Sequence, residues 1–109
     1  MGRFDEAIPH YDQVIAGGSG LIAKTARLGK AEAQLRAAQY DPAIATLKQL
    51  VDQKDATLPA EALLMELARA YRLAGNAEEA RKTLTQVVEQ HADSQYASEA
   101  RAELEKLKG

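Results

Sequence analysis

Apolar residues recur at helical spacing in six segments of the chain, and short polar or glycine-containing stretches separate these segments. In each segment the apolar positions follow the i, i+3, i+4, i+7 pattern, which places them on one face of a helix. The pattern therefore predicts an all-α protein, with helices over residues 4–16, 21–37, 40–53, 59–74, 77–91 and 95–107.

Glycine, proline and capping residues predict where these helices begin and end. The run Gly17–Gly20 predicts a loop that stops the first helix, in which Pro9 removes one backbone donor and should bend or fray the early turns. Pro42 lies in the first turn of its helix, where proline is tolerated. Thr57 is expected to cap the fourth helix with Pro59 just inside it, and Asn76 is expected to cap the fifth.

Two helices carry unusual distributions of apolar residues. The segment 21–37 has two apolar stripes, which predicts contact with two neighbours; the stripes are Leu28, Ala31 and Leu35, and Ile22, Ala26, Gly29 and Ala33. The segment 95–107 has one apolar face and one charged face, as a terminal capping helix requires. On the fifth helix, Glu78 and Lys82 are spaced for an i,i+4 ion pair.

One hexapeptide pattern occurs three times, beginning at Gly2, Ala38 and Gly75, with offsets of 36 and 37 residues. A large side chain follows four residues after the last alanine of each copy, at Tyr11, Leu47 and Leu84. Self-similarity at such a period predicts a stack of helical units that bury their apolar faces on one another.

These residues resemble the tetratricopeptide repeat (TPR) family. One complete set of packing positions is present at the spacing of the family: Leu64, Leu67, Ala68, Tyr71, Gly75, Ala80 and Leu84. The middle copy matches with Ala31, Ala38, Tyr40, Ala43 and Leu47, but carries Lys30 and Gln34 where large apolar or aromatic residues are usual. The first copy keeps only the second half of a repeat, with Gly2, Phe4, Ala7, Tyr11 and Val14.

The resemblance implies a right-handed superhelix of antiparallel helix pairs. Residues 1–109 would form a single domain, with a half repeat at 1–16, repeats at 21–54 and 59–91, and a capping helix at 95–107. Because the first copy begins in the middle of a helix pair, we expect the chain to be a fragment of a longer protein.

The segment 91–100 also looks like a boundary common in bacterial cell-envelope TPR proteins, such as the ancillary subunit of the Sec translocon. This resemblance implies an N-terminal single-span anchor upstream and a periplasmic or membrane-anchored location. A cytoplasmic location is the alternative.

In this family, partners usually bind the concave face, through the first helix of each pair. The resemblance implies a protein or peptide partner held by a mixed apolar and cationic strip, with the protein acting as a non-enzymatic scaffold. The chaperone-tail clamp of the family needs Lys and Asn where this chain has Leu28, Glu32, Met65 and Arg69, so we do not expect that ligand. The concave-face positions in the middle repeat are Thr25, Leu28, Glu32, Leu35 and Arg36. Those in the last full repeat are Met65, Glu66, Arg69, Arg72 and Leu73. The alternative to partner binding is that Arg69 and Arg72 are ordinary solvated charges on the helix surface.

Composition narrows the possible chemistry. The chain has no cysteine, its formal net charge is −2, and no apolar run approaches the length of a membrane span. We therefore expect no nucleic-acid binding and no membrane insertion by this segment. His10 and His91 lie in different repeats, and no serine has a base at an interpretable spacing. The sequence accordingly predicts no catalytic, cofactor-binding or metal-binding residues.

The first helix suggests an alternative function. Ile8, Tyr11 and Ile15 would lack part of the helix on which such residues usually pack, and an exposed apolar stripe favours self-association. The alternative to partner binding is therefore a homo-oligomerisation module that dimerises through this helix.

Overall fold

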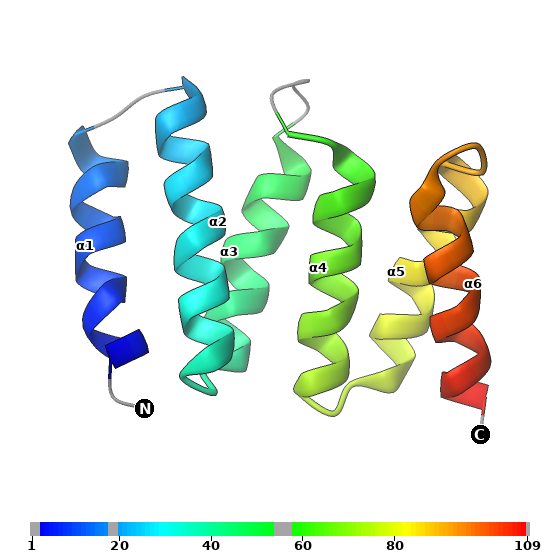
Figure 1. The fold of residues 1–109 in the computed structure, drawn as a ribbon. Coiled ribbons are helices and arrows are strands. Elements are labelled where there is room, and N and C mark those ends of the chain that lie inside the picture. Colours follow the sequence, from blue (N-terminus) through cyan, green and yellow to red (C-terminus); the bar gives the residue numbers. More distant parts are fainter. Residues whose placement is uncertain (1–2, 18–19, 54–57, 109) are drawn as a thin grey trace. The chain divides into compact units, whose positions relative to one another are not determined.

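The computed structural model describes residues 3–17, 20–53 and 58–108. Within these ranges the chain forms six helices and no strands (Figure 1). The contacts divide it into two compact units, Met1–Thr57 and Leu58–Gly109. The first unit contains α1 (Arg3–Gly17), α2 (Gly20–Arg36) and α3 (Tyr40–Asp52), and the second contains α4 (Ala60–Leu73), α5 (Ala77–Gln90) and α6 (Gln95–Lys108). The all-α prediction is confirmed, whereas the assignment of all residues to one domain stays a prediction.

The predicted helix ends agree with the observed ones to within one residue, but the predicted loop after α1 and the predicted start of α4 are wrong. Gly17 ends α1 and Gly20 begins α2, so the prediction of a loop from Gly17 to Gly20 is wrong at both ends. Residues 18–19 lie outside the described part of the chain. Pro59 is the N-cap of α4 rather than a residue inside it, because its ψ of 126° is extended and α4 begins at Ala60. Thr57, the predicted cap, also lies outside the described residues. The helix α1 continues through Pro9.

In the first unit α2 packs against both α1 and α3. Its buried residues are mostly small, namely Ala23, Ala26, Ala31, Ala33, Gln34 and Leu35. The two-neighbour prediction for α2 is therefore confirmed, but Ile22 was assigned wrongly, since it is 64 % exposed at the start of the helix.

Close contacts attach α1 to α2. The ring of Tyr11 lies against Gly29, where an added Cβ would be only 2.5 Å from Tyr11 Cε1. Beside this contact, Lys30 Nζ pairs with Asp12 Oδ1 at 2.6 Å. The absence of a side chain at Gly29 thus gives the tyrosine its place, and Lys30, unusual for the repeat pattern, serves as a link between the helices.

Gln34, the other unusual residue of α2, forms a buried hydrogen bond to α3. The hydroxyl of Thr46 lies 3.0 Å from Gln34 Oε1 and 3.0 Å from the carbonyl oxygen of Pro42. Both side chains are buried. A buried polar group costs free energy unless it is paired, so the pairing explains why a glutamine is tolerated in this core.

The second unit places α5 in contact with both α4 and α6, and α4 also contacts α6. Asn76 caps α5 as predicted, its Oδ1 accepting from the backbone N–H of Glu79 at 3.3 Å. Ser94 Oγ accepts from the N–H of Tyr96 at the start of α6. At the other end of α6, the guanidinium of Arg81 donates to the carbonyl oxygen of Leu107 at 3.4 Å.

The predicted ion pair between Glu78 and Lys82 is wrong. Glu78 pairs with Arg81 at 3.1 Å, and Lys82 pairs with Glu79 at 3.6 Å, both at i,i+3. Because i+3 and i+4 neighbours are about equally near on a helix, side-chain rotamers rather than spacing decide between them.

Candidate functional site

The helix α4 buries one face and leaves another face accessible. Leu63, Leu64, Leu67, Ala68, Ala70 and Tyr71 are buried in the second unit. Of the predicted binding residues on this helix, Met65 and Glu66 are half-buried, and Arg69, Arg72 and Leu73 are exposed. Met65, Arg69 and Leu73 are spaced at i, i+4 and i+8, which places them in one row along the helix.

The two arginines of this strip have different electrostatic surroundings. Arg69 Nη1 lies 3.7 Å from Glu66 Oε2, so part of its charge is already compensated within α4. Arg72 forms no ion pair within the described residues. A guanidinium presents several donors that match a carboxylate, so Arg72 is the better placed of the two for an incoming acidic group.

Leu73 makes the strip partly apolar. It is 38 % exposed and is one of four large apolar side chains that the described residues expose. The strip therefore combines apolar surface that a partner could bury, at Leu73, with the positive charge of Arg72 one residue away.

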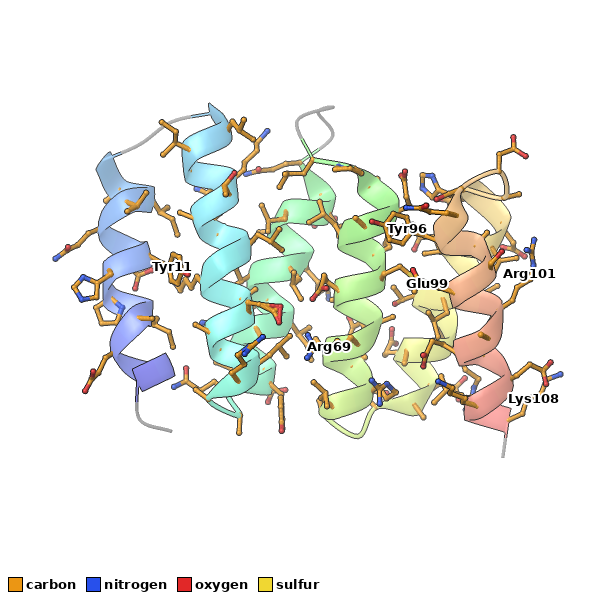
Figure 2. The ribbon with its side chains drawn as sticks, viewed as in Figure 1. Tyr11, Arg69, Tyr96, Glu99, Arg101 and Lys108 are labelled. Carbon is orange, nitrogen blue, oxygen red and sulfur yellow. The ribbon has the colours of Figure 1, made fainter. Side chains whose placement is uncertain are left out.

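The helix α6 lies beside α4, and its residues do not join the predicted strip. Figure 2 shows Tyr96 and Glu99 on the side of α6 that faces α4, whereas Arg101 points away from α4. Arg69 leaves α4 on the side away from α6, so Glu99 does not neutralise it (Figure 2). Tyr96 belongs to the apolar face of segment 95–107, and this periodicity is the only sequence signal for its position beside α4.

The matching positions in the first unit lie on α2. Thr25 and Arg36 are exposed, Leu28 and Glu32 are half-buried, and Leu35 is buried at 5 % exposure. Leu35 therefore offers almost no surface for a partner. The residues on α2 and those on α4 belong to different compact units, and the α2 set presents less exposed apolar surface than the α4 set.

The residues predicted to mediate self-association, Ile8, Tyr11 and Ile15, are all half-buried. Tyr11 is occupied by its contact with Gly29 of α2. Among the residues of α1 whose side chains the structure describes, the most exposed large apolar one is instead Val14, at 45 %.

The remaining candidate chemistry is limited. Among the described residues, no three His, Asp or Glu side chains gather into a group that would hold a metal ion. His91 Nδ1 lies 3.5 Å from Glu61 Oε2 and so joins the end of α5 to the start of α4. No helix in the described part of the chain is long and apolar enough to cross a membrane.

Comparison with known families agrees with the internal repeat. A model described as tetratricopeptide repeat matches residues 1–64 and again residues 59–104. No curated protein and no solved structure matches the chain. The two matches together extend over nearly the whole sequence, and they agree with the six helices and with the repeated turn. The chain belongs to the tetratricopeptide repeat family.

Proposed function

We propose that this protein is a non-enzymatic scaffold that binds a segment of a partner protein on the exposed strip of α4. Tetratricopeptide repeats generally mediate protein–protein interactions. The observation that carries the proposal is the row formed by Met65, Arg69 and Leu73 with Arg72 beside it. This row joins accessible apolar surface to the guanidinium of Arg72, which has no ion-pair partner among the described residues.

The chemistry of this strip favours a particular kind of segment. An apolar side chain of the partner would bury the exposed part of Leu73, and a carboxylate nearby would accept from Arg72. The charge-assisted bond would fix the orientation of the segment, while the apolar contact would supply most of the attraction. The expected partner segment therefore has an acidic residue flanked by apolar ones.

Leu28, Glu32 and Arg36 on α2 are a separate candidate strip within the first unit. Leu35 is not included, because it is buried. A location in a bacterial cell envelope is a further part of the proposal, supported only by the resemblance of residues 91–100. Self-association through Ile8, Tyr11 and Ile15 has less support, because these residues are half-buried.

The proposal is tested by selecting binders from a displayed library of random peptides. We expect the selected peptides to be enriched in Asp or Glu next to apolar residues. We expect Arg72→Glu to weaken their binding by about tenfold or more, since it replaces an attraction with a like-charge repulsion.

Arg101→Glu is the matched control. It makes the same charge change on an exposed residue that points away from α4 (Figure 2). The proposal fails if no acidic enrichment appears, or if Arg101→Glu weakens binding as much as Arg72→Glu does.

A further inference from the structure

Three side chains form a line along the accessible face of α4. Glu61 lies eleven residues before Arg72, and Met65 lies between them. Because an α-helix turns about 100° and rises about 1.5 Å per residue, Glu61 and Arg72 leave the helix in directions only about 20° apart, and about 16 Å apart along the axis. Met65 lies about 40° around the axis from Glu61 and about 6 Å along it. The face thus presents an acidic, an apolar and a cationic side chain in that order.

The acidic end of this line is held loosely. Among the described residues, the ion-pair partner of Glu61 is His91 at the end of α5, with 3.5 Å between Glu61 Oε2 and His91 Nδ1. Direct N–H···O hydrogen bonds usually measure about 2.7–3.2 Å. The two side chains keep 28 % and 27 % of their surfaces exposed. Another cation can therefore reach this carboxylate, and His91 itself is a cation only when its imidazole is protonated.

The segments that adjoin this pair supply no other positive charge to Glu61. The last turn of α5 has no basic residue, and the first basic residue of α6, Arg101, points away from α4 (Figure 2). Tyr96 and Glu99 lie on the side of α6 that faces α4 (Figure 2). The ionisable groups on these segments are acidic side chains and a phenol, namely Glu89, Asp93, Tyr96 and Glu99. Their negative charge favours a cation at this end of α4.

A segment complementary to the line has a basic, an apolar and an acidic side chain in sequence. In an extended chain that rises about 3.3 Å per residue, the distance from Glu61 to Arg72 corresponds to about five residues, and long side chains can shorten this to about four. The apolar residue opposite Met65 would lie about two residues from the basic one. A segment with acidic side chains alone would instead place like charges against Glu61.

We propose that Glu61 binds a basic residue of the partner segment and that protonated His91 competes for the same carboxylate. This inference rests on the proposed function, because it concerns the segment that Arg72 orients. Imidazole side chains change charge between about pH 5 and 8. At the upper end of this range His91 is neutral and leaves Glu61 to the partner, whereas at the lower end the imidazolium occupies Glu61. Binding therefore weakens as the pH falls.

The first test compares the peptides that the wild type and Glu61→Lys select at pH 8 from one displayed library of random peptides. We expect the wild-type peptides to carry Lys or Arg four or five residues from the acidic residue. Glu61→Lys should remove this basic enrichment, keep the acidic residue opposite Arg72, and weaken the binding of the most enriched wild-type peptide by about tenfold. Glu89→Lys is the matched control, because it makes the same charge change on an exposed residue of α5 at the same end of the unit and should leave the enrichment unchanged.

The second test requires no change to α4. The affinity of the most enriched peptide for the wild-type protein is measured by fluorescence anisotropy at pH 8 and at pH 5.5. We expect binding to be about two- to fivefold weaker at pH 5.5, which is the size of an exposed ion pair. His91→Gln should remove this difference. His10→Gln should keep it, because His10, the other histidine of the chain, belongs to the first unit.

Three results would overturn the inference. One is acidic enrichment without a basic residue at the expected distance, and another is basic enrichment that persists in Glu61→Lys, which would place the basic residue elsewhere. The third is an affinity that is equal at the two pH values, or a pH difference that His91→Gln leaves in place, since His91 would then not compete for Glu61. Each of these leaves the proposed function standing, whereas a lack of acidic enrichment would refute both.

Discussion

The turns that join α2 to α3 and α4 to α5 have the same geometry but different residues at their centre. Ala38 has a φ of 63° and Gly75 a φ of 84°. At the first turn the N–H of Gln39 bonds to the carbonyl oxygen of Gln34 at 2.7 Å, and at the second the N–H of Asn76 bonds to that of Tyr71 at 2.8 Å. Both are Schellman ends, which favour glycine in the left-handed position.

We predict that the reciprocal substitutions Ala38→Gly and Gly75→Ala have opposite effects on the free energy of unfolding. A left-handed conformation costs an L-residue roughly 1–2 kcal/mol. Replacing alanine by glycine removes this cost, but it also stabilises the unfolded chain by about 0.4–1 kcal/mol, because glycine gives that chain more conformational entropy. Ala38→Gly should therefore stabilise the protein by about 0.5–1 kcal/mol.

Gly75→Ala should destabilise by a similar amount. No atom lies within 4 Å of the Cβ that alanine would add, so the substitution introduces no clash and changes only the backbone term. The two positions share no hydrogen-bond partners, and their effects should add in the double variant.

Urea unfolding followed by far-ultraviolet circular dichroism measures both effects. Ala74→Gly is the control, since Ala74 immediately precedes Gly75 but has a φ of −77°. Glycine at this position relieves no left-handed strain and only increases the conformational entropy of the unfolded chain, so Ala74→Gly should destabilise the protein. If Ala38→Gly also lowered the urea midpoint, the left-handed cost that we assign to Ala38 would be refuted.

Three further substitutions test the internal contacts. Thr46→Val should cost about 1–3 kcal/mol by leaving Gln34 Oε1 without its donor, and thermal unfolding should show most of the loss restored by adding Gln34→Leu. Gly29→Ala should destabilise the wild type because the new Cβ meets the ring of Tyr11, yet stabilise a Tyr11→Leu background by up to about 1 kcal/mol through helix propensity; equal effects in both backgrounds would contradict the close contact. Arg81→Ala should speed amide hydrogen exchange in the last turn of α6 but not in its first turn, and unchanged exchange at both ends would show that the bond to the Leu107 carbonyl contributes nothing.

The candidate site was only partly predictable. The alignment of the repeats identified Met65, Arg69, Arg72 and Leu73, and the structure leaves the last three exposed. It also identified Leu35, which is buried. A repeat position tells which face a residue occupies, but the depth to which neighbouring side chains cover it depends on their sizes and rotamers. The difference between Arg69, which faces Glu66, and Arg72 likewise follows from side-chain geometry rather than from spacing.

The sequence by itself determined the features that depend on a few consecutive residues. The helical periodicity, the cap at Asn76 and the glycine at the end of α4 each depend on residues within one or two turns of one another. They can therefore be predicted from the sequence alone. Only the tertiary structure decided the features that depend on a second helix. Lys30 and Gln34 depart from the repeat pattern, and the sequence alone does not explain them. The structure explains them by their partners on neighbouring helices, Asp12 of α1 and Thr46 of α3. Val14 has the same type of residue and the same repeat position as Val87, yet one is exposed and the other buried, because burial depends on whether a neighbouring helix covers the position.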